Sequence, residues 1–273
     1  MQANTEIVAP GISTETTFTE DLSETITSVG EFSSYSGIEF RETFGADRSV
    51  TKASITTGDG GRLIFDKADG AQFTQVSQGY ATAAINKDQT AVALVVEPIE
   101  QGWSYQTFGV WVRSPAQGNP GRIGAASVGN MSPTASVPMT GVGVFNGKAT
   151  GIRTDSFGVS IEFTSADMRM SVDFGSRAAS FQTRNTLASS DLTRWYKNSL
   201  LDMNGTLQIV PGSNNLVGTA TVPGLTIGGV ESTRMSGNIN AKFYGPSAQE
   251  IGGTFGLKGS GVETYIGGFG GKR

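Results

Sequence analysis

The side chains best suited to recognition are clustered in one segment of the chain. Residues 189–201 contain Arg194, Trp195 and Tyr196, and these three residue types dominate the energetics of protein interfaces. The wider stretch 176–204 has no glycine, although the chain has 38 glycines. This segment therefore stands apart from the turn-rich sequence around it and is a candidate partner-binding element.

A short helix is expected within this segment. Ser190 is suited to cap its N-terminus, and Asp191 would lie favourably near the positive end of the helix dipole. Leu192, Trp195 and Tyr196 would then share one helix face. The segment either presents its side chains to a partner, or it buries Trp195 at one end of a β-barrel as part of the core.

Catalytic chemistry is poorly supplied. The chain has no histidine and no cysteine, which removes the commonest general base, thiol nucleophiles, zinc–thiolate sites, iron–sulfur clusters and disulfides. The acidic pairs Glu97/Glu100 and Asp66/Asp69 invite comparison with glycosidases, but close spacing in a loop does not place two carboxylates on either side of a bond. We therefore expect a binding protein and not an enzyme.

Bulk properties set the scale of the fold. The chain has 273 residues, long enough for a substantial core, and no apolar run long enough to span a membrane as a helix. Residues 1–102 carry 15 acidic and 6 basic groups (−9), whereas residues 103–273 carry 9 and 14 (+5). The split predicts two regions with different surfaces, and without a basic cluster nucleic acid is not an expected partner.

The first region begins with an acidic leader, residues 1–34, with six acidic residues, no basic ones and twelve Ser or Thr. This composition is typical of disorder unless the segment lies across a partner or its own domain. Self-association through residues 1–34 is therefore one expectation. Residues 35–102 follow with short alternating runs separated by Asp-Gly and Gly-Gly pairs, which predict hairpins and a small β-rich handle domain.

The second region, residues 103–273, predicts a larger β structure. Strands of 6–10 residues are expected at regular spacing, punctuated by turns such as 204–205, 211–215 and 258–261. One strand should end at Gly245-Pro246, and Gly252-Gly253 favours a bulge, a bend or close backbone packing in the next. Closure into an eight-stranded antiparallel up-and-down barrel would leave no exposed edges. The expected fold is all-β, with the barrel preceded by the handle.

Several motifs in this region resemble a known family. Residues 243–255 read Phe-Tyr-Gly-Pro-Ser-Ala-Gln-Glu-Ile-Gly-Gly-Thr-Phe, similar to the late-strand motif of the transferrin-binding protein B barrels and their surface-lipoprotein and hemophore relatives. The Phe-Gly-Val-Trp run at 108–111 and the Gly-x-Phe-Gly-Gly-Lys ending are also similar. Gly143 and Phe145 depart from the family pattern, where Ala and Tyr are usual. The resemblance covers 103–273 well and 35–102 only by position.

The resemblance implies a function. It implies a Gram-negative protein, secreted or at the outer-membrane surface, that captures a host or environmental protein or heme without covalent chemistry, often in iron acquisition and with a TonB-dependent receptor. Heme iron would need Tyr or Met ligands here, and Tyr80 and Tyr196 are the candidates outside predicted strands. The predicted binding residues are therefore Tyr80, Arg194, Trp195 and Tyr196. The alternative is a structural subunit of a surface layer, filament or shell assembled through the N-terminal arm.

Overall fold

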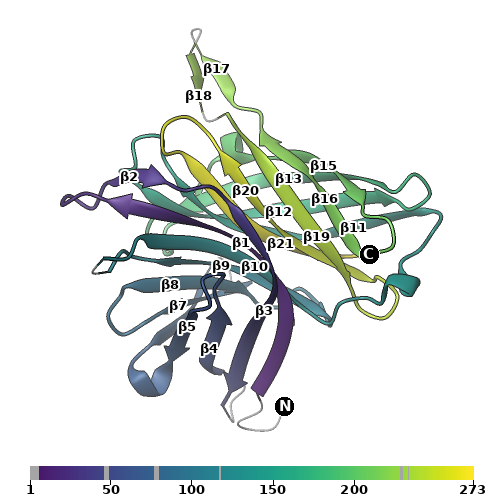
Figure 1. Cartoon of the computed structure of the whole chain (residues 1–273), viewed down its shortest axis with the longest axis horizontal. Coiled ribbons are helices and arrows are strands. Elements are labelled where there is room, and N and C mark those ends of the chain that lie inside the picture. The colour runs from purple at the N-terminus through teal and green to yellow at the C-terminus, as the bar shows by residue number, and fades with distance from the viewer. Residues whose placement is uncertain (1–5, 46–48, 77–79, 117, 228–229, 233) are drawn as a thin grey trace.

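Two large antiparallel β-sheets make up most of the molecule (Figure 1). The computed structural model describes residues 6–45, 49–76, 80–116, 118–227, 230–232 and 234–273. The N-terminal sheet, here called the first lobe, has the strand order β5-β4-β3-β1-β10-β9-β8-β7-β6, with β2 added beside β1. Its strands are β1 (Glu6–Glu20), β2 (Ile26–Val29), β3 (Ser33–Phe44), β4 (Val50–Thr56), β5 (Arg62–Asp66), β6 (Gln72–Val76), β7 (Ala81–Ile85), β8 (Ala91–Val96), β9 (Gln106–Arg113) and β10 (Gly121–Gly129).

The C-terminal sheet closes on itself through pairing of β12 with β13, giving the predicted eight-stranded up-and-down barrel. Each barrel strand pairs with its neighbours in the chain, and the last strand pairs with the first. The barrel strands are β11 (Val142–Thr154), β12 (Ile161–Asp173), β13 (Ala178–Ser189), β15 (Asn204–Ile209), β16 (Asn215–Val222), β19 (Met235–Tyr244), β20 (Glu250–Lys258) and β21 (Thr264–Lys272). The fold is all-β, as expected.

Short elements complete the described chain. Strand β14 (Tyr196–Lys197) extends the barrel sheet at β13, and β17 (Leu225–Ile227) pairs with β18 (Val230–Ser232) in a hairpin that projects from the barrel (Figure 1). Three 3₁₀ turns occur at η1 (Lys67–Asp69), η3 (Thr134–Ser136) and η4 (Ser199–Leu201). No helix in the described part of the chain is long and apolar enough to cross a membrane.

The two sheets divide the chain at a different place from the expected one. We expected residues 103–273 to form the barrel, but β9 and β10 pair with β8 and β1 in the first lobe. The first lobe therefore extends to Gly129, and the barrel begins at Val142. Alternating apolar residues in β9 gave no indication of which sheet it joins, because both of its faces are covered.

The acidic leader forms the longest strand of the first lobe. β1 lies between β3 and β10 and pairs with both, so each of its edges is used within the chain. Its β-branched content of Ile, Val and Thr favours a strand, and the buried hydroxyls of Ser13 and Thr16 donate to Glu15 and to the Gly30 carbonyl. Thr14 shares a hydrogen bond of 2.8 Å with Thr254 of the barrel. Order in this segment thus comes from the protein's own two sheets.

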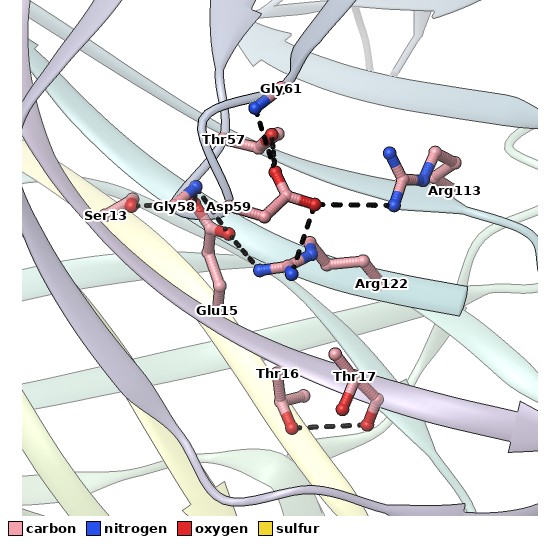
Figure 2. A network of polar contacts seen from close by, with 10 residues as sticks. All are labelled: Ser13, Glu15, Thr16, Thr17, Thr57, Gly58, Asp59, Gly61, Arg113 and Arg122. Carbon is pink, nitrogen blue, oxygen red and sulfur yellow. Dashed lines mark hydrogen bonds and ion pairs between the residues drawn. The ribbon is translucent and has the colours of Figure 1, made fainter. Parts of the chain in front are cut away.

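A buried ion network fixes β1 to the rest of the first lobe (Figure 2). The Glu15 carboxylate, on a residue only 1% exposed, accepts the Gly58 N–H at 2.9 and 3.0 Å and pairs with Arg122 at 3.0 Å. Arg122 also pairs with Asp59 at 3.2 Å, and hydrogen bonding from Thr57 and the two nearby guanidinium groups hold the Asp59 pKa low against the effect of burial. The network thereby ties the β4–β5 turn across β1 and β10.

Close packing explains the paired glycines, against the first lobe for Gly252 and within the barrel for Gly253. A Cβ added at Gly252 would lie 2.6 Å from the Ser127 hydroxyl oxygen, and one at Gly253 would lie 2.1 Å from the Asn240 carbonyl oxygen. The pairing of β19 with β20 is continuous there, so of the three expected roles the glycines serve close packing and not a bulge. β19 ends at Tyr244, directly before Gly245-Pro246, as predicted.

Candidate functional site

A groove of about 800 Å³ separates the edge of the first lobe from the barrel, and two of the four predicted binding residues line it. Tyr80 and Ile85 contribute from the β6–β7 side of the first lobe, and Lys148 contributes from β11. Trp195 lies on the barrel side with the loop that precedes it. The full lining is Thr74, Gln75, Val76, Tyr80, Ala83, Ile85, Lys148, Ser165, Leu187, Asp191, Leu192, Thr193 and Trp195.

The loop that carries Trp195 is built around Asp191. Its Oδ1 accepts the backbone N–H groups of Thr193 and Arg194, both at 2.9 Å. These bonds stabilise the carboxylate and hold the Asp191 pKa well below its usual range. Leu192 has φ of 61°, a left-handed conformation that a helix does not allow. The predicted helix over this segment is therefore wrong, because the Asp191 side chain takes the amides and folds a tight loop.

Trp195 is fixed by this loop. Its indole Nε1–H donates to the Leu192 carbonyl at 3.2 Å, and both side chains pack on the apolar cluster between the two lobes. That cluster includes Val76 and Ala81 of the first lobe and Phe163 of the barrel. Trp195 is thus partly buried between the lobes and also lines the groove. This position combines the two expectations for Trp195, burial in the core and presentation to a partner.

Tyr80 faces Trp195's loop from the opposite side of the groove. It is partly buried, and the Lys148 ammonium lies 5.6 Å from the centre of its ring, within the range of a cation–π contact. Lys148 also pairs with Asp167 at 2.7 Å. The groove thus combines two aromatic side chains, one cation and apolar Leu and Ile surface, a composition suited to recognition of a partner.

Arg194 and Tyr196 do not line the groove. The Arg194 side chain is 92% exposed and pairs with Asp191 at 3.2 Å, so it lies on the outer rim of the loop. Tyr196 donates its hydroxyl hydrogen to Glu162. Glu162 in turn pairs with Arg153 at 3.0 Å, and Arg153 pairs with Glu263 at 2.7 Å. Tyr196, and not Trp195, therefore covers the charged end of the barrel.

The hydrogen bond to Glu162 also changes the acidity of Tyr196. The neighbouring carboxylate and partial burial raise the pKa of Tyr196 to about 12, because an ionised phenol there would face a negative charge. A phenolate is the form of tyrosine that ligates ferric heme iron well. This environment disfavours Tyr196 in that role and leaves Tyr80 as the predicted ligand with a groove beside it.

The charged side chains among the described residues that line the groove are already engaged. Its one lining carboxylate, Asp191, is occupied by backbone amides, and its one lining cation, Lys148, is ion-paired. Within the described residues, no group of three or more His, Cys, Asp or Glu side chains is placed to hold a metal ion. The sequence did not point to Lys148 and Leu187 as groove residues. Both lie on long barrel strands, and the alternation of side chains along a strand shows which residues point outward but not which part of the protein they face.

Comparison with known proteins places the fold. Residues 137–273 match the family model described as the C-lobe and N-lobe β-barrels of transferrin-binding protein B. No curated protein sequence matches the chain. The departures at Gly143 and Phe145 do not prevent the match, since Phe145 is fully buried in the barrel core, where an aromatic ring is what the position requires.

Solved structures agree at the level of fold. Intact Ap-TbpB, with its N and C lobes, is 12% identical with a TM-score of 0.50, over 99% of this chain and 77% of that one. A Trp-176-Ala mutant of transferrin-binding protein B from Haemophilus parasuis Hp5, described as a vaccine antigen, is 11% identical with the same TM-score, over 98% and 76%. The closed eight-stranded barrel and the match over its whole length show that this chain belongs to the family of transferrin-binding protein B lobe barrels.

Proposed function

We propose that this protein is an exported bacterial binding protein, secreted or held at the cell surface, that captures a host protein by non-covalent contacts in the groove between its lobes. The observation that carries the proposal is the convergence of Tyr80 and Trp195 on one groove, although they lie far apart in sequence and on different lobes. Membership of the transferrin-binding protein B family supports a protein partner, and transferrin is the first to test.

The groove has the features of an interface hot spot. Trp195 is held in one orientation by its bond to Leu192, so little side-chain entropy is lost when a partner covers it. Arg194 lies on the rim with its charge exposed to water. There it would raise the association rate with an acidic partner more than it would strengthen the complex. The predicted order of importance is therefore Trp195 and Tyr80 above Arg194.

The test is a direct binding measurement with purified chain and iron-loaded transferrin, by calorimetry or an optical biosensor. Tyr80→Ala and Trp195→Ala should each weaken binding by about 2 kcal/mol or more, and Arg194→Ala by less than about 1 kcal/mol. Phe157→Ala is the matched control, because Phe157 is 79% exposed and lies outside the groove. Equal loss in Phe157→Ala, or none in Trp195→Ala, would contradict the groove as the site.

Heme is the second ligand to examine, since the groove offers Tyr80 as an oxygen ligand beside an aromatic wall. Titration with hemin should shift the Soret band if iron is ligated, and Tyr80→Phe should abolish the shift while Tyr196→Phe leaves it. A titration without any shift would remove heme and leave the protein partner as the sole candidate. A TonB-dependent receptor belongs to the same proposal, as the membrane component that would accept captured iron.

A further inference from the structure

The first lobe has a mouth that the inter-lobe groove does not use. An open cavity of about 690 Å³ lies at the end of the first lobe where β1 begins and β8 ends. Apolar side chains dominate its wall, and Ile99 and Val8 there are 71% and 47% exposed. Its size is within the range of pockets that hold small organic molecules, roughly 300–1,000 Å³.

The mouth continues into the interior of the first lobe. A second cavity, of about 40 Å³, lies among the inward-facing residues of the lobe and shares Phe40, Glu42 and Thr107 with the mouth. Trp111 lines this inner cavity, is 2% exposed, and has an indole Nε1–H with no hydrogen-bond partner among the described residues. Buried donors are nearly always paired, so an unpaired one beside a cavity indicates room for a ligand or water.

Among the described residues, two carboxylates and no basic side chain line the mouth. Glu42 lies on β3 in register with inward-facing Phe40 and Phe44, and Glu97 follows β8. Burial and the charge of Glu97 together raise the pKa of Glu42 to about 8. Thr82 donates a hydrogen bond of 2.5 Å to the Glu97 carboxylate. Within the described residues, no side-chain hydrogen bond of this kind reaches the Glu42 carboxyl group.

Another buried polar group of β9, at the interface with the barrel, also lacks a hydrogen-bond partner among the described residues. Gln106 is 4% exposed, and within the described chain neither its Oε1 nor its Nε2 makes a hydrogen bond. Its amide lies against Gly252 and Gly270 of the barrel, on the face of β9 opposite to Thr107, so it is directed at the interface of the two lobes and not into the mouth.

We propose that the mouth of the first lobe binds a small organic cation, an amine carried on an apolar body, with the ammonium group toward Glu97 and Glu42. The apolar body would lie along Ile99, Phe40 and Phe44, which line the mouth. The site is separate from the inter-lobe groove, with which it shares no lining residue.

The experiment compares three ligands that differ only in head group: hexylammonium, 1-hexanol and hexanoate. Binding to the full chain is followed by calorimetry and by the fluorescence of Trp103 and Trp111, which line the two cavities. Hexylammonium should bind about tenfold or more tightly than 1-hexanol, and hexanoate most weakly, because only the cation is attracted by the acidic pair. Equal affinities, or no binding by any of the three at millimolar concentration, would overturn the proposal.

Variants locate the head group. Glu97→Gln should reduce hexylammonium affinity about fivefold or more and leave 1-hexanol unchanged. Glu31→Gln is the matched control, because Glu31 is an exposed acid outside the mouth, paired with Lys258. Ile99→Ser changes a side chain that is already exposed, so folding should be unaffected, and it should weaken hexylammonium and 1-hexanol alike. A Glu97→Gln protein that folds normally and binds hexylammonium as before contradicts the assignment.

Discussion

The two lobes are both curved β-sheets, but they differ in how far the sheet closes and in how their interiors are filled. The barrel closes completely and fills its interior with large side chains, among them Phe145, Phe181 and Phe269, each at most 2% exposed. The first lobe ends at β5 and β6 without pairing them, and small residues such as Ala84, Ala93 and Ala126 occupy much of its interior. The barrel interior is packed, whereas the first-lobe interior holds a cavity.

The difference indicates that the two lobes are stabilised in different ways. Aromatic packing and full hydrogen-bond closure make the barrel a rigid support with no free edge. Alanines and the open seam leave the first lobe with spare volume, and its order depends instead on polar anchors such as the Glu15–Arg122 pair. Stability should therefore depend on apolar packing in the barrel and on specific ion pairs in the first lobe.

The strongest test of that contrast is loss of a core ring from each lobe. Phe269 has no exposed surface and its ring centre lies 4.8 Å from that of Phe181, so Phe269→Ala should lower the free energy of unfolding by about 3–5 kcal/mol. Phe40→Ala in the first lobe should lower it less, because Phe40 borders an open mouth that water can fill. Urea unfolding of both variants measures the difference, and an equal loss would show that the two interiors are equally packed.

A smaller but still large effect is expected at the first-lobe ion network (Figure 2). Glu15→Gln removes the buried charge that pairs with half-buried Arg122, and it should cost about 2–4 kcal/mol, moderated by Asp59, which remains beside the guanidinium. Glu31→Gln breaks an exposed pair with Lys258 and should cost less than about 1 kcal/mol. A cost for Glu15→Gln no greater than for Glu31→Gln would mean that polar anchors do not hold the first lobe.

Adding side-chain volume should also destabilise the barrel more than the first lobe. Ala149→Val inserts two methyl groups into the filled barrel and should destabilise by about 1–3 kcal/mol, because packed cores resist extra volume. Ala126→Val points at the first-lobe cavity and should be neutral within about 0.5 kcal/mol. Thermal unfolding monitored by circular dichroism distinguishes the two, and a destabilised Ala126→Val protein would show that the cavity cannot accept a side chain.

The sequence predicted the barrel better than the first lobe because the barrel follows local rules. Alternation, the Gly245-Pro246 stop and hairpin turns are all readable within a few residues. β1 is different: its buried polar groups are satisfied by Arg122 and Thr254, more than 100 positions away. Composition alone therefore indicated a disordered leader where the fold contains a central strand.

The candidate site was predictable in its residue types and not in its geometry. Trp195 was recognised by type, but the i, i+3, i+4 spacing that suggested a helix is overridden by Asp191, whose side chain folds a loop. The meeting of Tyr80 with that loop depends on how two separate sheets pack, which no local pattern carries. Strand β12 shows the same limit, since strands of 6–10 residues were expected and this one runs for 13, with a register shift in its pairing with β13.

The finest distinction between the lobes is electrostatic. Burial, with the charge of Glu97 adding to it, raises the pKa of Glu42 from 4.5 to about 8 inside the first lobe. A carboxyl group with a raised folded-state pKa favours the folded state most when both states are protonated, below about pH 4.5. That contribution declines as pH rises from about 4.5 to about 8 and is lost above it. In Glu42→Gln the side chain is neutral at every pH, so this decline should disappear.

Unfolding free energies of the wild type and Glu42→Gln, measured in urea from pH 5 to pH 9, test this directly. The variant should gain on the wild type by about 1–2 kcal/mol across that range, because the wild type alone must ionise a partly buried acid. Glu97→Gln removes the charge that repels the Glu42 carboxylate, so it should lower the pKa of Glu42. The free energy of unfolding of this variant at neutral pH should therefore be reduced less by the ionisation of Glu42 than that of the wild type. Parallel curves for the wild type and Glu42→Gln would mean that Glu42 ionises freely, and that the first-lobe interior is as accessible to water as its mouth.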